Sequence, residues 1–334
     1  VCTVCTGCGR GTHHKPVRSI YYWKTTWQTD STTRQRLQDL HVQRMYLRLF
    51  DADIAEPGGT PAPVAILQLK QPLLPGIQYV PVVYITQRAL HGLTQDGGAQ
   101  LGRRIAQLVQ AWCTDNGVTT DELQLDCDWT QQTRATYFAL LQAVRQHPFT
   151  KGKILSCTIR LHQIKYAART GVPAVDKGLL MCYNMGNLKQ YGPHNSILDP
   201  TEAQKYLATV GAYPLPLDVA LPLFSWCVRF HNKQFAGILR EVTSTQLAGD
   251  ALFTQTRPNL FSCGSDTVWH GYPLRSGDEI RTEQSVPDDV LEIAGYTAKH
   301  LRNEQVNVIL FSCDSLTLSN FNNNELEAIY HTYR

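Results

Sequence analysis

The chain has 334 residues, of which 43% are hydrophobic and 18% are charged, so it can bury a large core and is not a disordered protein. The formal net charge is +3, from 31 Lys and Arg against 28 Asp and Glu, which gives no reason to expect nucleic acid or an acidic membrane as partner. No run of about 20 apolar residues is available to span a bilayer.

The N-terminal segment suggests export. It begins with small, weakly apolar residues and places Gly7 directly before Cys8; a polar, basic stretch over residues 10–18 follows. This pattern resembles the end of a bacterial lipoprotein signal, in which the cysteine after a small residue carries a lipid, although Cys5 stands where leucine is usual. We therefore expect residues 1–17 to be leader and spacer, with lipidation at Cys8, and residues 18–334 to be one folded domain.

Two other interpretations of this segment stay open. One is a zinc site, whose ligands would be Cys2, Cys5, Cys8 and either His13 or His14. Structural zinc sites generally use two ligand pairs separated by a folded loop, and this cluster is too compact for that arrangement. The other is a leader without a function of its own.

Eight short runs rich in β-branched and aromatic residues predict strands. In chain order they are Ser19–Trp23, Met45–Phe50, Tyr79–Ile85, Leu123–Cys127, Ile154–Leu161, Gly178–Tyr183, Leu217–Phe224 and Val306–Phe311.

Helical patterns lie between most of these runs, and a last one closes the chain. They cover Ser31–His41, Gln100–Cys113, Thr130–Arg145, Thr201–Leu207, Asp288–Leu301 and Glu325–Tyr333. Alternating strands and helices indicate parallel strands, since each crossover needs a helix, and eight is the number at which such a sheet closes. The sequence therefore predicts a single-domain α/β fold, a (β/α)₈ TIM-type barrel.

One long stretch does not fit this alternation. Residues from about Glu241 to Gln284 are rich in Thr, Ser, Gly and Asp and lack clear periodicity, so we expect an insertion after the seventh strand. The competing fold is an open doubly wound sheet, which the absence of a glycine-rich phosphate loop after the first strand disfavours.

Seven cysteines follow the N-terminal segment, an odd number without a disulfide pattern. They are Cys113, Cys127, Cys157, Cys182, Cys227, Cys263 and Cys313. All but Cys113 and Cys263 lie in or beside apolar strand-like runs, and we expect those five to be buried as small apolar side chains.

In a barrel the functional residues lie at the carboxyl ends of the strands. The residues that follow the eight runs combine aromatic, acidic and amide side chains. The candidates for ligand binding are Trp23, Asp51, Trp129, Arg160, His162, Tyr183, Asn184, Trp226 and Asp314. Aromatic rings of this kind pack on the apolar faces of sugars, while the polar groups bind hydroxyls. For each of them a structural role competes: a tryptophan in the core, or an aspartate that caps a helix.

The strongest local signal is Asp126-Cys127-Asp128 at the end of the fourth run. Alternation along a strand places both carboxylates on one side, where two neighbouring acids raise each other's cost of ionisation. Asp126 and Asp128 are therefore the candidate catalytic pair. The alternative is that one of them binds Arg160 or His162 and only stabilises the barrel.

Two segments resemble the chitinase-like glycoside hydrolases of family 18. The segment Leu123–Thr130 (LQLDCDWT) is similar to the family's fourth-strand motif Asp-x-Asp-Trp-Glu, and Met181–Asn184 (MCYN) to its sixth-strand Met-x-Tyr-Asp/Asn. The resemblance implies that Asp126 and Asp128 correspond to the family's inner aspartates, and that Tyr183 and Asn184 hold the acetamido group of a substrate. The family's general acid is the glutamate that ends the first motif, and Thr130 occupies that position here.

The whole chain also resembles an uncharacterised family of bacterial barrel proteins, which implies the fold but no reaction. The cues are the Asp-x-Asp fourth strand, LSCT at Leu155–Thr158 and the seventh-strand segment LPLDVALPLF.

These features together predict a lipid-anchored barrel of the bacterial cell envelope (periplasm or outer membrane) that hydrolyses or binds a carbohydrate. A glycan-binding or scaffold protein without catalysis is the alternative, which Thr130 favours. We expect no metal, cofactor or nucleic acid, and contact with the membrane only through the anchor at Cys8.

Overall fold

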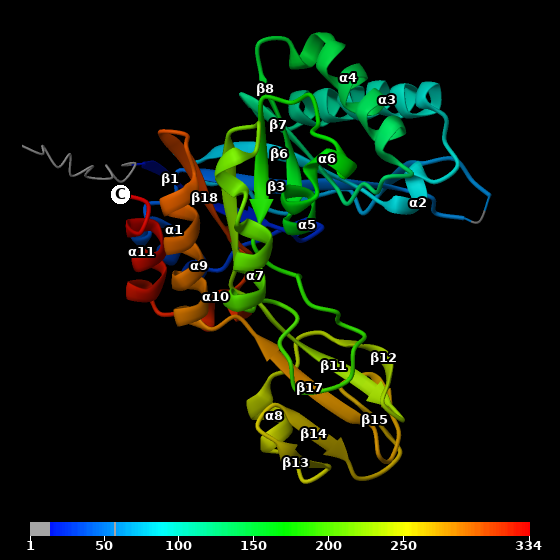
Figure 1. Cartoon of the computed structure of the whole chain (residues 1–334), viewed down its shortest axis with the longest axis vertical. Coiled ribbons are helices and arrows are strands. Elements are labelled where there is room, and N and C mark those ends of the chain that lie inside the picture. The colour runs from blue at the N-terminus through cyan, green and yellow to red at the C-terminus, as the bar shows by residue number, and fades with distance from the viewer. Residues whose placement is uncertain (1–13, 57) are drawn as a thin grey trace, which may run out of the picture.

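The computed structural model describes residues 14–56 and 58–334, and its centre is a closed barrel of eight parallel strands (Figure 1). The barrel strands are β1 (Lys15–Tyr22), β3 (Arg44–Asp53), β6 (Gln78–Ile85), β7 (Glu122–Cys127), β8 (Ile154–Arg160), β9 (Lys177–Met181), β10 (Leu217–Pro222) and β18 (Gln305–Phe311). The sheet closes because β1 pairs in parallel with both β18 and β3. The (β/α)₈ fold and all eight predicted strands are thus confirmed.

β1 begins at Lys15, so the first barrel strand includes the last three residues of the segment that we expected to precede the domain. Two short pairings decorate the barrel near its carboxyl end. β4 (Ala62–Val64) lies antiparallel to β3, and β2 (Thr26–Trp27) pairs with β5 (Gln68–Leu69).

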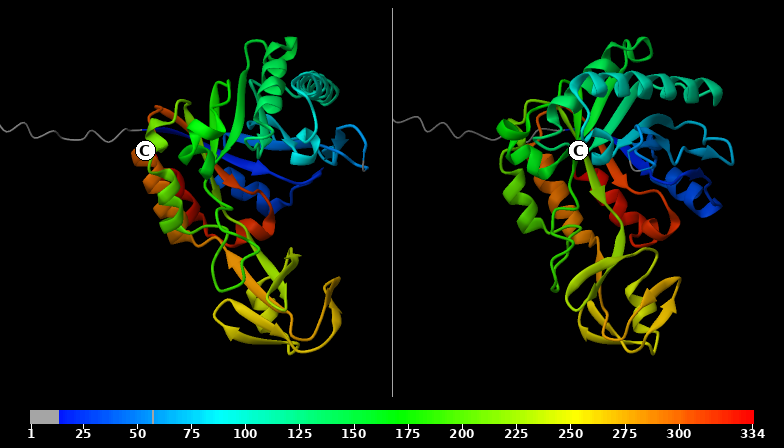
Figure 2. Two further views of the ribbon diagram at one scale, coloured as in Figure 1. Left: turned by 45° about the vertical axis from the view of Figure 1, so that its right-hand side comes forward. Right: turned by 90° about the vertical axis from the view of Figure 1, so that its right-hand side faces the viewer.

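Helices surround the barrel, as the right-hand view of Figure 2 shows. They are α1 (Ser31–Asp39), α2 (Gln87–Leu90), α3 (Gln95–Asp115), α4 (Arg134–Gln146), α5 (Leu161–Lys165), α6 (Ala167–Thr170), α7 (Pro200–Leu207), α9 (Pro287–His300), α10 (Ser315–Ser319) and α11 (Asn323–His331), with 3₁₀ turns at Pro148–Thr150 and Val210–Ala212. Each predicted helix is present, within a few residues at its ends.

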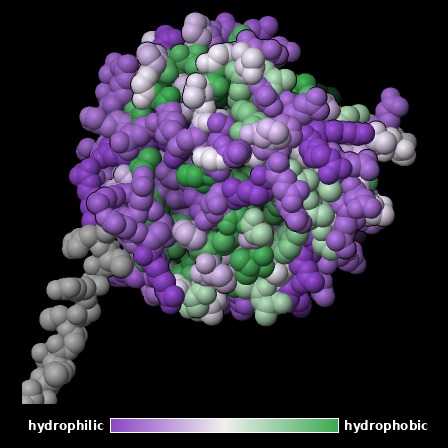
Figure 3. Space-filling view, turned by 90° about the horizontal axis from the view of Figure 1, so that it is seen from above, coloured by the Kyte–Doolittle hydropathy of each residue, from purple (hydrophilic) through white to green (hydrophobic). Residues whose placement is uncertain are grey.

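α3 and α4 pack unusually closely. A Cβ atom at Gly98 or Gly102 of α3 would clash with the backbone oxygens of Thr136 and Leu140 of α4, so only glycine allows this approach. The face seen from above this pair is mostly hydrophilic, with scattered hydrophobic patches (Figure 3).

The insertion after the seventh strand is an ordered lobe below the barrel (Figure 1). Its antiparallel sheet has the order β12-β11-β17-β14-β13. The elements are β11 (Ser225–His231), β12 (Gln234–Leu239), α8 (Ser244–Ala248), β13 (Phe253–Arg257), β14 (Leu260–Cys263), the hairpin β15 (Thr267–Trp269) and β16 (Tyr272–Leu274), and β17 (Glu279–Gln284). A small hydrophobic core of its own includes Leu247, Phe261 and Ile280.

The predicted start of this insertion was wrong. It begins at Ser225, because β11 and β12 already belong to the lobe, and it contains short strands where we expected irregular chain. Strands of three to six residues carry too few alternations to stand out in a Thr- and Ser-rich sequence.

A buried arginine joins the lobe to the loop after β9. The Arg281 side chain is fully buried, forms an ion pair with Glu283 at 2.6 Å and donates to the carbonyls of Leu188, Gln190 and Gly192. Glu283 also accepts from the backbone N–H of Ser196, at 2.8 Å. These bonds hold the lobe beside the carboxyl end of the barrel.

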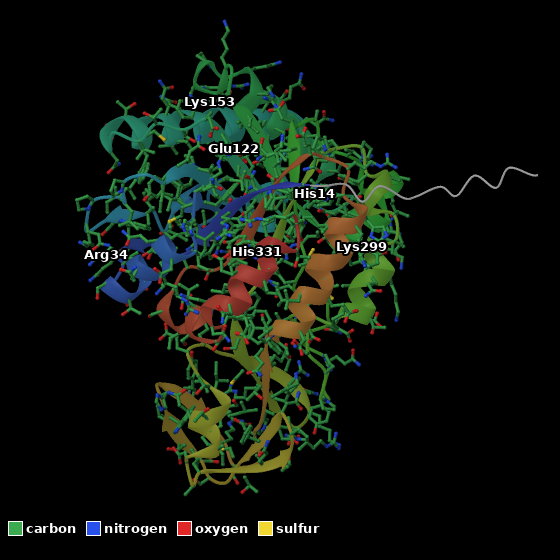
Figure 4. The ribbon with its side chains drawn as sticks, turned by 90° about the vertical axis from the view of Figure 1, so that its left-hand side faces the viewer. His14, Arg34, Glu122, Lys153, Lys299 and His331 are labelled. Carbon is green, nitrogen blue, oxygen red and sulfur yellow. The ribbon has the colours of Figure 1, made fainter. Side chains whose placement is uncertain are left out.

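The opposite, N-terminal end of the barrel is closed by buried charges. Figure 4 views this end, where Glu122 lies among the strand starts. Lys177 Nζ is 2.9 Å from a Glu122 carboxylate oxygen and 2.7 Å from an Asp218 carboxylate oxygen, and Glu122 is fully buried. Burial lowers the pKa of Lys177, but Asp218 and Glu122 outweigh that effect, so its pKa is raised. These buried ion pairs fill the N-terminal end of the barrel interior.

All seven cysteines after the N-terminal segment are buried free thiols, which include the five for which burial was expected. Burial raises the pKa of the Cys113 thiol to about 11 and that of Cys227 to about 12, which keeps both protonated and unreactive. No helix in the described chain is long and apolar enough to cross a membrane.

The predicted lipid site Cys8 and the alternative zinc ligands Cys2, Cys5 and His13 lie outside the described residues. His14 is described, and its two ring nitrogens are each 2.7 Å from a backbone carbonyl, those of Asn303 and Ala298. This position between two carbonyls favours a structural role for His14 over zinc binding.

Candidate functional site

The interior of the barrel is lined by alternate residues of β7. Glu122 and Asp126 accept hydrogen bonds from Ser156 and Thr158 of β8, each at 2.6 Å. Gln124, between them, donates to Ser156 Oγ at 3.4 Å. This pattern confirms the period of two, and Asp126 is the member nearest the carboxyl end of the strand.

Asp126 is an acid held in an unfavourable environment for its charge. Its side chain is 4% exposed, and burial raises its pKa to about 6, with a further contribution from the neighbouring Asp128. Arg160 and the bond from Thr158 act in the opposite direction. Asp126 therefore changes its protonation state just below neutral pH.

Asp128, in contrast to Asp126, forms an ion pair with Arg160. Arg160 Nη2 donates to one carboxylate oxygen at 2.8 Å and Arg160 Nε donates to the other, so both oxygens are engaged. Burial lowers the pKa of Arg160, but Asp128 and Asp126 raise it overall, which keeps the guanidinium charged. The predicted pairing of an acid with Arg160 thus exists, and it involves Asp128 and not Asp126.

The position of the family's general acid offers no carboxyl group here. Thr130 is exposed and lies in the turn before α4. Its backbone N–H donates to Thr133 Oγ1 at 3.0 Å, and the two hydroxyls are 3.3 Å apart. Thr130 therefore shapes the start of the helix and has no proton to give at ordinary pH.

A pocket of about 200 Å³ opens beside Arg160, the partner of Asp128. Four of the predicted residues line it, together with Leu161, Met185 and Tyr206: Arg160, His162, Tyr183 and Asn184. Burial lowers the pKa of His162, so its ring is mostly neutral at pH 7. The structure thus brings Arg160 and His162, at the end of β8, into one pocket with residues at the end of β9 that lie more than 20 positions further along the chain.

Tyr183 lines this pocket and carries a buried hydroxyl without a partner among the described residues. The side chain is 2% exposed, and its hydroxyl has no hydrogen-bond partner in the described part of the chain. Burial raises the pKa of Tyr183 well above its ordinary value, so the hydroxyl keeps its proton. A buried hydroxyl without a partner costs free energy unless a ligand or water binds it.

Aromatic rings continue from the pocket across the mouth of the barrel. Tyr183 lies 5.3 Å from Phe311, Phe311 lies 5.7 Å from both Trp23 and Phe224, and Phe224 lies 5.2 Å from Trp226, between ring centroids. All but Tyr183 are partly exposed. The predicted tryptophans Trp23 and Trp226 are thus parts of one aromatic surface, which the barrel and the insertion share.

The other side of Trp23 is bordered by charge. Arg48 forms an ion pair with Asp51, donating to it from Nε at 2.7 Å, and its guanidinium lies 5.6 Å from the Trp23 ring centre. Asp51 therefore contributes to the mouth by holding the Arg48 guanidinium beside Trp23. Burial, with Asp126 and Asp128, raises the pKa of the neighbouring Tyr84 to about 12.

Two predicted binding residues do not reach this site. Trp129 is fully buried, stacks on Tyr137 at 5.2 Å and donates its indole N–H to Thr170, because the chain has left the strand and turned into the helical layer. Asp314 accepts from the backbone N–H and the hydroxyl of Thr317 and so caps α10. For both, the structural role is the correct interpretation.

Sequence reasoning missed several residues of the mouth. Tyr206 comes from α7, and Arg48 lies inside β3, so neither follows a strand directly. Phe224 and Phe311 are the last residues of predicted strands, and the site residues were sought after these strands. Thr158 could have been found, since period-two alternation in β8 places it beside Asp126.

Fold and site together define a (β/α)₈ barrel whose mouth combines aromatic rings with the Asp128–Arg160 ion pair. No model of a known protein family and no curated protein sequence matches the chain. Solved structures do match. The C-terminal domain of a putative chitinase from Desulfitobacterium hafniense DCB-2 has a TM-score of 0.57 at 9% identity, over 95% of this chain and 98% of that one.

A family 18 chitinase from Cycas revoluta in complex with (GlcNAc)3 has a TM-score of 0.55 at 12% identity, over 95% and 100% of the two chains. The spore cortex-lytic enzyme SleL of Bacillus cereus has a TM-score of 0.51 at 14% identity, over 92% and 75%. The chain therefore has the fold of the chitinase-like barrels, at a distant level of sequence similarity.

Proposed function

We propose that this protein binds an N-acetylated oligosaccharide at the mouth of its barrel and does not cleave it. The proposal is based on the absence of a free carboxyl group at two of the positions that correspond to the fourth-strand motif of the resembling hydrolases. Arg160 engages both oxygens of Asp128, and the position where the resembling hydrolases have their general acid holds Thr130. A general acid or base typically contributes about 10²–10⁴ in rate, so its loss leaves a binding site.

The mouth keeps what sugar binding needs. Aromatic rings surround a pocket that has a few polar groups, as is usual for small-molecule sites. The resemblance assigns Tyr183 and Asn184 to the acetamido group of a ligand, and both residues line the pocket. Chitinases of the same fold are known with (GlcNAc)3 and (GlcNAc)4 bound.

Hydrolysis is the second candidate, and one observation favours it. The pKa of Asp126, about 6, is in the range that suits a general acid near neutral pH. Against this role, Asp126 is almost fully buried and accepts a bond from Thr158. Only product analysis separates the two candidates.

The test is a calorimetric titration of the chitin tetramer, (GlcNAc)4, into the wild type and Tyr183→Phe. The variant loses only the unpaired hydroxyl, so binding should weaken about 2- to 10-fold, as for the loss of one hydrogen bond, with no loss of thermal stability. Tyr213→Phe is the matched control. Its hydroxyl is also buried without a partner in the described chain, but it lies before β10 at the other end of the barrel. Equal weakening in both variants would contradict the proposed site.

We further propose that the protein is held in the bacterial cell envelope by a lipid on Cys8. The support is the Gly7-Cys8 sequence alone. Metabolic labelling with a fatty-acid probe should mark the full-length protein and should fail on Cys8→Ala. Equal labelling of both forms would reject the anchor and leave the glycan site unaffected.

A further inference from the structure

The stretches of chain that begin at the ends of β8 and β9 contain basic residues, and the first acidic residues after them are Asp176 and Asp199. Residues 160–175 and 183–198 include no Asp or Glu. Their basic side chains are Arg160, His162, Lys165, Arg169, Lys189 and His194. The chain as a whole is nearly balanced, so this asymmetry belongs to the rim of the site and not to the general composition.

Two of these cations are held on aromatic rings next to the pocket. Lys165 Nζ lies 4.8 Å from the ring centre of Tyr206, which lines the pocket, and 5.6 Å from that of Tyr166. The Arg169 guanidinium lies 5.2 Å from the Tyr166 ring centre. We call Lys165, Tyr166, Arg169 and Tyr206 the basic shelf. It continues from the pocket wall outward along α5 and α6.

Within the described chain no ion pair neutralises this shelf. Lys165 and Arg169 are exposed and lack a carboxylate partner there. Arg134 adds a third cation, since its Nη1 donates to the Arg169 carbonyl at 3.1 Å and no described acid pairs with it.

The nearby acids are already engaged. Asp128 is bound by Arg160, Glu202 pairs with Lys205, and Asp199 accepts from the backbone N–H of Glu202 as the cap of α7. The Glu283 carboxylate of the insertion is bound by Arg281. Apart from the Asp199 carboxylate, whose charge a hydrogen bond does not neutralise, the unpaired charges of the described chain at this side of the mouth are those of Lys165, Arg169 and Arg134.

We propose that the oligosaccharide recognised by this protein is anionic. One sugar occupies the pocket at Tyr183, and a carboxylate or sulfate on a neighbouring sugar lies on the basic shelf against Lys165 and Arg169. The inference rests on the proposed function and specifies its ligand. Charged oxygens suit these cations because charge-assisted hydrogen bonds are the stronger ones, and the tyrosine rings keep the cations in place.

The experiment compares tetrasaccharides with and without a negative charge, and the acid and its methyl ester are the matched pair. The probes are neutral (GlcNAc)4, a tetramer in which N-acetylglucosamine alternates with N-acetylmuramic acid, the methyl ester of that tetramer, and a sulfated (GlcNAc)4. At low salt the wild type should bind the carboxylated tetramer about 3- to 10-fold more tightly than its ester, the gain of two exposed charge pairs. This advantage should shrink at about 0.5 M NaCl, because exposed charges are screened. The sulfated tetramer shows whether a carboxylate is required or any anion suffices.

The variant Lys165→Ala/Arg169→Ala should lose the preference for the charged tetramers and keep the affinity for neutral (GlcNAc)4. The matched control is Lys151→Ala/Lys299→Ala, at two exposed lysines away from the mouth, which should keep the preference. Lys299 is visible on the opposite face in Figure 4.

The outcomes separate the two proposals. Equal affinity of the wild type for neutral and charged tetramers, or a preference that survives in Lys165→Ala/Arg169→Ala, overturns the anionic ligand and leaves glycan binding intact. Failure of every tetramer to bind overturns both.

Discussion

Replacing Asp126 with asparagine should stabilise the protein at pH 8 and change its stability little at pH 4. Burial raises the pKa of this carboxyl from 3.8 to about 6. Between these pH values the folded protein holds a proton that the unfolded chain has lost, so the wild type becomes less stable as the pH rises through this window. The penalty at pH 8 amounts to about 3 kcal/mol. Asparagine has no charge to bury and its side-chain oxygen can still accept from Thr158, so about 1–3 kcal/mol of this should be recovered.

Urea unfolding of wild type and Asp126→Asn at pH 4, 6 and 8 measures this effect. Asp115→Asn, at an exposed acid near the end of α3, controls for the loss of one negative charge. A variant that is less stable than the wild type at pH 8 would show that the Asp126 charge is satisfied in the fold, and would strengthen the case for a charged catalytic role.

Replacing Lys177 with methionine should destabilise the protein strongly, by about 3–5 kcal/mol, the usual cost of breaking a buried ion pair from one side. The lysine neutralises Glu122 and Asp218 at the closed end of the barrel, where both carboxylates are buried. Without it Asp218 has no ion-pair partner in the described chain, and Glu122 keeps only the more distant Arg44, at 3.7 Å.

The free energy of unfolding of Lys177→Met and of Lys177→Met/Asp218→Asn tests the network. The double variant should be more stable than the single one, since the unpaired charge of Asp218 is gone. Lys151→Met, at an exposed lysine before β8, is the control and should change stability by less than about 0.5 kcal/mol. A loss in Lys177→Met no larger than in the control would mean that the network does not contribute to stability.

The fold was predictable because each strand of a closed parallel barrel is a short, apolar, β-branched run separated from the next by a helix. Leu123–Cys127 and Val306–Phe311 are clear examples. The insertion was only partly predictable. Its first strand, Ser225–His231, follows the apolar end of β10 directly, with no turn residues to separate them.

The site was predictable only where it lies on regular strands. Alternation along β7 correctly placed Asp126 in the interior, and the strand-end rule found Arg160, Tyr183 and Trp226. The same rule failed at Trp129, because the chain turns outward directly after Asp128, and at Asp314, which caps a helix that the sequence did not reveal. The basic shelf depends on contact between α5, α6 and α7, and contact between helices distant in sequence leaves no local pattern.

Recovery of the ligand after it has bound shows whether the protein only binds the tetramer or also cleaves it. The protein is incubated with (GlcNAc)4 at a concentration that saturates the calorimetric titration, at pH 5, 6 and 7, and the saccharides are then analysed by mass spectrometry. If the protein binds without hydrolysis, we expect saturable binding and an intact tetramer at every pH. Shorter products that accumulate with time and disappear in Asp126→Asn would contradict it and make the protein a hydrolase with Asp126 as its acid.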